Sequence, residues 1–327
     1  MFSFYDKLFQ KQKMMRTVLI ALAPIIIYSV YLYGWRALAL VAFNMLVATI
    51  VEYLSETKIY KRKKVTEAVL VTAVLFTLTL PPAIPFWISA VGISFGVFFG
   101  KMLFGGFGKN VFNPALVGRA FIYVNFPLHL TIYWNQAMNG TKLFNGLGGF
   151  THWLTPMIDD VSSATPMMAF RNLGESLNNI QLLFGNIPGA VGETSKVLIL
   201  LAAAYLIYKK VASWEIMLAN VVGFTALTLI FNLMGVSSIP NPIEGMLMGG
   251  FLFGAVFMAT DPISAPKTKI AKWLYGILIG CVVVIIRGFA LFSGGMMFAV
   301  LIGNTFGPII DYVANKVKQN KKNKAVA

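Results

Sequence analysis

The chain has 327 residues, of which 57% are hydrophobic and 12% are charged, whereas about a quarter of the residues in a soluble domain are charged. The single cysteine, Cys281, and the two histidines, His129 and His152, exclude an intrachain disulfide, a zinc site of four cysteines or of two cysteines and two histidines, and an iron–sulfur cluster held by this chain alone. The formal net charge of +15 requires either an acidic partner or a membrane topology that sorts basic residues by side.

Residues 1–16 form a polar segment that contains Lys7, Lys11, Lys13 and Arg16. The apolar run that follows is long enough to span a bilayer, and no small-residue cleavage site comes after it. We therefore interpret this segment as a retained cytoplasmic N-terminus and not as a cleaved signal peptide.

About ten apolar runs follow along the chain, each close to the roughly 20 residues that cross a ~30 Å hydrocarbon core. Inside a bilayer every backbone polar group must be satisfied internally, so these runs must be helices. The predicted spans are 17–34, 36–54, 67–82, 84–104, 111–133, 195–209, 213–234, 242–259, 272–288 and 293–313. The predicted fold class is therefore an all-α integral membrane protein with about ten transmembrane helices.

The distribution of Lys and Arg predicts the orientation of these helices. If the N-terminus is cytoplasmic, most of the 27 basic residues fall in segments on the cytoplasmic side, including residues 58–64 and the C-terminal tail. We therefore expect a multi-pass protein with both termini in the cytoplasm and the long polar loop 134–194 facing outward. The basic charge then reflects topology and attraction of the tail to anionic lipid, and not nucleic-acid binding.

The two halves of the chain contain similar segments. Residues 67–76 and 244–253 share an initial Glu, two Leu and a final Phe, and a helix with a Gly-x-x-x-Gly pair follows each of them. The copies would enter the membrane from opposite sides, which predicts two inverted five-helix repeats with ligands near the membrane middle. Chance similarity between apolar helices is the alternative. The predicted organisation is a segment 1–16, a repeat 17–133, an outward loop 134–194, a repeat 195–313 and a basic tail 314–327.

The outward loop contains the sequence Asp159-Asp160-Val161-Ser162-Ser163-Ala164-Thr165-Pro166. Its residue types suit a polar turn or a helix start. The pattern also resembles the flavinylation signature Asp-x-x-Ser/Thr-x-Ala-Thr, with Asp159, Ser162, Ala164 and Thr165 at the matching positions and Ser163 in place of a common glycine. This resemblance implies that FMN is joined through its phosphate to the Thr165 hydroxyl, where the flavin would supply the redox chemistry.

Two further stretches, residues 105–121 and 258–266, resemble the fifth-helix region and the eighth-helix end of the NqrB/RnfD family of membrane proteins. With the loop motif between them, the resemblance covers nearly the whole chain, and it is closest to RnfD of the Rnf complex. It implies a urea-transporter-like fold in the inner (cytoplasmic) membrane.

The resemblance also implies a non-covalent riboflavin site at Asn110, Asn113 and Asp261. These three residues are predicted to lie at the cytoplasmic ends of helices from opposite repeats, so they could converge on one pocket. The alternative interpretation is structural, in which the two asparagines cap the fifth helix and Asp261 ends the eighth.

Two other residues are candidates for contact with a cofactor. Arg119 lies well inside a predicted span, where a charge costs several kcal/mol and requires a partner or a purpose. A flavin, an ion path, or the carboxylate of Glu67 or Glu244 could provide that partner. Trp153, near the attachment motif, could stack on a flavin. We predict no metal site and no catalytic side chain.

The predicted function is electron transfer across the membrane, coupled to movement of Na+ or H+, by one subunit of an Rnf-type ferredoxin:NAD+ oxidoreductase. Such a subunit would not be active alone, and its partners would include an extracytoplasmic FMN-carrying subunit and iron–sulfur subunits. The alternative within the family is the NqrB protein of a Na+-translocating NADH:quinone reductase, which usually has a longer N-terminal extension. A urea-transporter-like channel is the alternative from another class, and it has no need of the loop motif.

Overall fold

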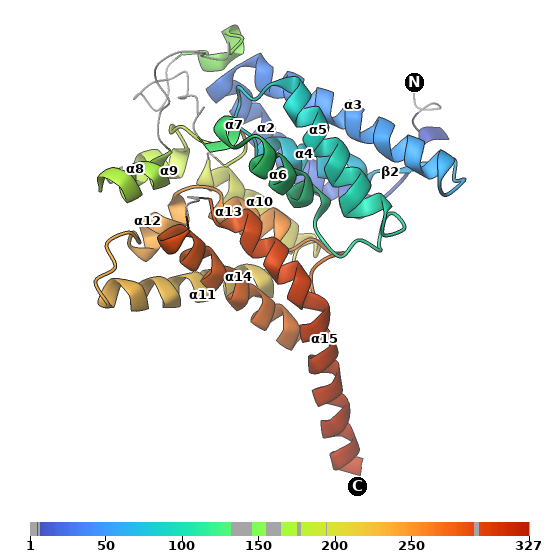
Figure 1. Ribbon diagram of the computed structural model, residues 1–327, viewed down its shortest axis with the longest axis vertical. Coiled ribbons are helices and arrows are strands. Elements are labelled where there is room, and N and C mark those ends of the chain that lie inside the picture. The colour runs from blue at the N-terminus through green and yellow to red at the C-terminus, as the bar shows by residue number, and fades with distance from the viewer. Residues whose placement is uncertain are drawn as a thin grey trace.

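The computed structural model describes residues 5, 7–131, 146–154, 165–174, 178–193, 195–290 and 294–326. The regular elements in these residues are helices, apart from the short strands β1 (Phe9–Gln10) and β2 (Val65–Thr66), which pair in parallel. Figure 1 shows the helices of the first half, in blue and green, packed against those of the second half, in yellow, orange and red. The end of the last helix extends away from this body.

The elements follow one another in chain order through both halves. The first half contains α2 (Lys13–Tyr33), α3 (Trp35–Lys58), α4 (Ala68–Leu78), α5 (Phe86–Val97), the π-helix η1 (Phe98–Met102), α6 (Pro114–Asn125) and α7 (Pro127–Thr131). Between the halves lie the 3₁₀ turn η2 (Gly148–Thr151), α8 (Pro166–Leu173) and α9 (Asn179–Phe184). The second half contains α10 (Lys196–Tyr208), α11 (Trp214–Leu233), α12 (Pro242–Leu247), α13 (Phe251–Phe253), the π-helix η3 (Gly254–Met258), α14 (Lys269–Phe289) and α15 (Met296–Val326).

Among the described residues, five helices are long and apolar enough to cross a membrane by themselves: α2, α3, α11, α14 and the first 25 residues of α15. They correspond to five of the predicted spans. The other five predicted spans appear in the described residues as shorter or interrupted helices. The mainly helical membrane fold is therefore confirmed, while the number of ten spans remains a prediction.

The interruption after α4 is caused by Pro81 and Pro82, because proline has no N–H for the helical ladder. Backbone carbonyls freed in this way must find donors inside a membrane protein. Arg36, which is buried, donates from its guanidinium to the carbonyls of Pro82 and Ile84. The first half can thus hold non-helical backbone within its core.

The second half has a similar interruption between α12 and α13, where Gly249 adopts a left-handed conformation with φ +60°. Arg287, near the end of α14, donates to the carbonyl of Gly245 over 2.5 Å and to that of Met248 over 3.1 Å. A buried arginine therefore supports an interrupted helix in each half.

Both Gly-x-x-x-Gly pairs lie at close helix crossings. The pair on α5 faces α6, the next helix in the chain, whereas the pair on α14 faces α11, an earlier helix. A Cβ on Gly96 of α5 would lie 3.0 Å from the Cα of Gly118 on α6, and a Cβ on Gly280 of α14 would lie 2.6 Å from the amide nitrogen of Phe224 on α11. Because the two contacts are not equivalent, the inverted repeat remains a prediction.

Candidate functional site

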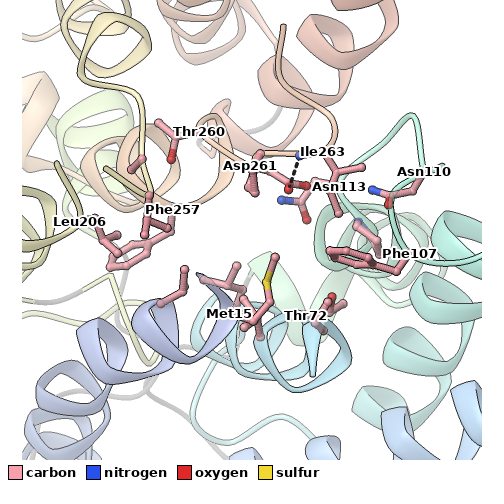
Figure 2. A pocket seen from close by; sticks show the side chains of 18 of the residues that line it. Met15, Thr72, Phe107, Asn110, Asn113, Leu206, Phe257, Thr260, Asp261 and Ile263 are labelled. Carbon is pink, nitrogen blue, oxygen red and sulfur yellow. Dashed lines mark hydrogen bonds between the residues drawn. The ribbon is translucent and has the colours of Figure 1, made fainter. Parts of the chain in front are cut away.

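Asn110, Asn113 and Asp261 line one cavity, as predicted from the sequence, although about 150 residues separate the asparagines from the aspartate. We call this space the amide cavity. The empty space between its lining residues, counted together with the part that is open solvent, is about 670 Å³. Figure 2 shows Met15 of α2, Thr72 of α4, Phe107 and the two asparagines, Leu206 of α10, Phe257 of η3, and Thr260, Asp261 and Ile263 arranged around it.

Asn113 is the N-cap of α6. Its side-chain oxygen accepts hydrogen bonds from the amides of Ala115 at 3.0 Å and Leu116 at 3.4 Å, and Pro114 occupies the first helical position. The backbone N–H of Asn113 donates to the side-chain oxygen of Asn304 of α15 over 3.1 Å. The structural interpretation is therefore confirmed for Asn113, and the same residue also borders the cavity.

Asp261 ends the segment that follows η3. One carboxylate oxygen accepts from the amide of Ile263 at 3.1 Å and the other from the hydroxyl of Ser264 at 3.0 Å. Loss of hydration raises the pKa of Asp261, while these two hydrogen bonds partly oppose that rise. A carboxylate has about four lone-pair positions, so acceptor capacity remains for a ligand in the cavity.

The side chains that line the amide cavity suit a ligand whose ring system is largely apolar and has polar groups at its edges. Phe107 and Phe257 supply aromatic surface, whereas amide, hydroxyl and carboxylate groups come from residues 110, 113, 260 and 261. Small-molecule sites typically combine an apolar lining with a few placed polar groups. An isoalloxazine ring and its ribityl hydroxyls match this donor and acceptor set.

Lys101 is a residue of this cavity that sequence reasoning missed. Its ammonium group lies 2.5 Å from the Glu52 carboxylate and 2.7 Å from the Thr66 hydroxyl, and its side chain is buried. The charge distribution alone groups Lys101 with the other basic residues of the cytoplasmic side. The signal that could have found it is its position within the apolar run 93–104.

Thr165 borders a second cavity, together with Pro166 and Met167 of α8, the helix at the left of Figure 1. We call it the arginine cavity. Thr165 is the N-cap residue of α8, but its hydroxyl makes no capping hydrogen bond with that helix. The charged side chains that line the cavity, among the described residues, are Arg119, Glu193, Lys196 and Arg287.

Arg119 pairs with Glu193 at 3.3 Å, and both side chains are 13% exposed. The two carboxylates named as candidates from the sequence, Glu67 and Glu244, do not pair with Arg119. Glu67 pairs with Arg16 at 2.5 Å, and Glu244 accepts a hydrogen bond from Asn241 at 2.8 Å. The carboxylate that pairs with Arg119 belongs to Glu193, in the loop between the halves, and so brings the end of this loop against α6.

Trp153 does not line the arginine cavity. Its backbone pairs with Gly34 at the tight turn between α2 and α3, and its side chain is 55% exposed. Gly34 has φ +80°, and a Cβ there would lie 2.5 Å from the carbonyl oxygen of His152. The predicted stacking of Trp153 on a flavin remains a prediction.

The two cavities lie at opposite ends of the same elements. On α10, Lys196 borders the arginine cavity and Leu206 borders the amide cavity, a separation of about 15 Å at the helical rise. On α6 and its cap, Arg119 lies at the arginine cavity and Asn113 at the amide cavity. The same two helices therefore border both cavities.

A model of the NQR2, RnfD, RnfE family matches residues 3–319. The chain belongs to this family. Its relatives include the NqrB proteins of the Na+-translocating NADH-quinone reductases of Stutzerimonas stutzeri, 43% identical over 77% of this chain, and of Pseudomonas aeruginosa, 41% identical over 77%. The NqrB protein of Klebsiella pneumoniae is 38% identical over 80% of this chain.

The aligned regions cover 60%, 60% and 63% of these three relatives, so the chain spans about three fifths of their length. The names of these relatives agree better with the NADH:quinone reductase, the alternative function predicted from the sequence, than with the Rnf-type oxidoreductase.

The motif 159–165, which resembles a flavinylation signature, lies only partly within the described residues. Asp159, Ser162 and Ala164 lie outside the described residues, and Thr165 is the first described residue after them. The role of this motif and of the amide-cavity residues therefore remains a prediction.

Proposed function

We propose that this chain is the membrane electron-transfer subunit of a redox-driven cation pump. In this proposal it carries FMN as a phosphoester on Thr165 and a second, non-covalent flavin, riboflavin, in the amide cavity. The observation that carries the proposal is the placement of two cavities with suitable chemistry at opposite ends of α6 and α10, one of them beside Thr165. Two redox positions would divide a ~30 Å membrane crossing that is too long for one.

Flavins supply the electron-accepting ring that the side chains of this chain lack. Attachment would form a bond between Thr165 Oγ and phosphorus and break a phosphoanhydride bond of a flavin dinucleotide donor. A nucleoside monophosphate would then leave, and the hydroxyl proton would pass to solvent. The hydroxyl can react without loss of a helix cap, because it makes no capping hydrogen bond with α8.

In the amide cavity the chain's own residues would bind and orient the second flavin. Asn110, Asn113 and Asp261 would hydrogen-bond its polar edge or its hydroxyl groups, and Phe107 and Phe257 would exclude water from its ring. Charge placed on a buried ring favours a compensating cation, which would couple electron transfer to movement of Na+ or H+.

The names of the relatives favour a complex of the Na+-translocating NADH:quinone reductase type over a ferredoxin:NAD+ oxidoreductase. We therefore propose that this chain works in the inner (cytoplasmic) membrane with an extracytoplasmic FMN-carrying subunit and iron–sulfur subunits. Lys316, Lys318 and the other basic residues of the tail favour a cytoplasmic position for the C-terminus.

Attachment is tested by denaturing electrophoresis and intact mass measurement of protein produced together with a flavin transferase. Wild-type protein should give a fluorescent flavin band and the added mass of FMN, and Thr165→Ala should lose both. Thr151→Ala is the matched control, because this exposed threonine lies in the same inter-half region and its hydroxyl contacts residues of its own turn, the Gly148 carbonyl and the His152 ring. A wild-type mass equal to that of the bare polypeptide would refute the proposal.

The type of complex is tested in membranes that contain all of its subunits. Na+-stimulated electron flow from NADH to quinone, abolished by Thr165→Ala, is the expected result. Na+-stimulated flow from ferredoxin to NAD+ would instead assign the chain to the Rnf type. A passive channel would show neither activity.

A further inference from the structure

We infer that Arg119 and Arg287 form a binding site for the phosphate that is attached to Thr165. This inference rests on the proposed function and deepens it, because it assigns to the arginine cavity a ligand class, a phosphodiester anion. The site would fix the position of the attached group at one end of α6 and α10, in addition to the covalent bond.

The first observation is the charge of the cavity. Among the described residues that line it, two guanidinium groups, those of Arg119 and Arg287, accompany one carboxylate, that of Glu193. Glu193 pairs with Arg119, and Arg287 is 3% exposed. Charges within a membrane protein are costly unless they are paired, so the second guanidinium group favours an anionic ligand.

The second observation is that both guanidinium groups have an unused donor. The Nε atoms of Arg119 and Arg287 are buried and have no hydrogen-bond partner among the residues that the structure describes. The other contacts of Arg287 go to the carbonyls of Gly245 and Met248, and Arg119 donates to Glu193. A buried donor without a partner is destabilising, and a phosphate oxygen is an acceptor that suits guanidinium.

The third observation is the position of Thr165. Its half-buried side chain borders the same cavity, and its backbone carbonyl accepts the first hydrogen bond of α8, from Ala169 at 2.9 Å. The attachment point and both arginines therefore share one space. A phosphodiester carries one negative charge, which would offset the charge of the second guanidinium group.

A cycle of four full-length proteins in detergent tests this inference. Wild-type protein and Arg119→Gln are each prepared bare and loaded, without and with the flavin transferase, and the apparent Tm of each is measured. Loading should raise the Tm of wild-type protein by at least roughly 2 °C, and this rise should be lost in Arg119→Gln. Arg119 is the better target because its ion pair is with Glu193, whereas Arg287 also supports the interrupted helix.

Two further variants make the result specific. Arg36→Gln is the matched control, since Arg36 is as buried as Arg287 and bonds carbonyls but does not line this cavity. It should keep the full rise on loading. Glu193→Gln removes the opposing carboxylate, so loading should raise its Tm by more than in wild-type protein.

Inorganic phosphate distinguishes a tethered phosphate from a free anion. Stabilisation of bare wild-type protein by phosphate that disappears after loading would support the inference, and equal stabilisation of both forms would overturn it. An equal rise in Tm on loading in wild-type, Arg119→Gln and Glu193→Gln proteins would also overturn it. Wild-type protein without the added mass of FMN would refute the proposed function and this inference together.

Discussion

At the scale of single residues, one pair of buried charges joins elements that are far apart in the chain. Lys101 of η1 pairs with Glu52 of α3, and both side chains are almost completely buried, at 2% and 0% exposure. Thr66 of β2 donates to the same carboxylate over 2.6 Å and so completes the cluster. The apolar lining of the amide cavity can therefore include an ammonium group without leaving its charge uncompensated.

We predict that Lys101→Met destabilises the protein by about 3–5 kcal/mol, because it leaves the Glu52 carboxylate buried without its cation. The double variant Glu52→Gln with Lys101→Met should recover most of this loss. Thermal unfolding in detergent measures both effects. The control is Lys272→Met, whose pair with Glu215 is 3.8 Å long and more exposed, and whose loss should cost at most about 1 kcal/mol. Equal losses in Lys101→Met and Lys272→Met would contradict the prediction.

At the scale of the elements, glycine decides which helices can approach one another closely. Gly276 and Gly280 of α14 face α11, where a Cβ on Gly280 would lie 2.6 Å from the Phe224 amide nitrogen. Close approach of this kind is common where small residues line helix interfaces in membranes. The crossing of α11 and α14 therefore depends on the absence of side chains at these positions.

We predict that Gly280→Ala destabilises the protein by about 1–3 kcal/mol, since the added methyl group must push the backbones of α11 and α14 apart. Gly189→Ala is the control, because no atom of a described residue lies within 4 Å of a Cβ there and its φ is not left-handed. Alanine at that position should be neutral or stabilising, because it restricts the unfolded chain. Apparent Tm values measure the difference, and a stable Gly280→Ala protein would show that the two helices are less closely packed than described.

At the scale of the whole molecule, the two cavities lie at opposite ends of the core, and the end of α15 extends well away from α8 and α9 (Figure 1). A protein that transfers electrons across a membrane needs sites near both faces and a shielded interior between them. The buried core supplies that interior, with side chains of α4 such as Phe76 and Leu78 fully enclosed.

We predict that Trp153 and Lys318 lie on opposite sides of the membrane. In a Cys281→Ala background, Trp153→Cys should react with a membrane-impermeant thiol reagent added outside intact cells. Lys318→Cys should react only after the cells are opened, because the basic end of α15 is retained in the cytoplasm. Both positions are exposed. Labelling of the two positions from the same side would refute the proposed orientation.

Local patterns were sufficient to predict the helical membrane fold and to offer Asn113 and Pro114 as the start of the fifth helix. The predicted topology, which places Asn110, Asn113 and Asp261 at helix ends on one side, predicted that they converge on one cavity. Hydropathy, capping and turn chemistry act over a few residues, so they can be read in a linear sequence. The interruption that follows α12 was not predicted, because the predicted span 242–259 continues through it.

The partner of Arg119 was decided by the tertiary structure. Glu193, 74 residues away, pairs with it, whereas the two candidate carboxylates named from the sequence, Glu67 and Glu244, make other contacts. Likewise, the burial of Lys101 and Arg287 and the shared cavity of Thr165 and the arginines exist only after the two halves have packed. Ion pairing and burial depend on distances in space, and local sequence carries no record of which distant segments will meet.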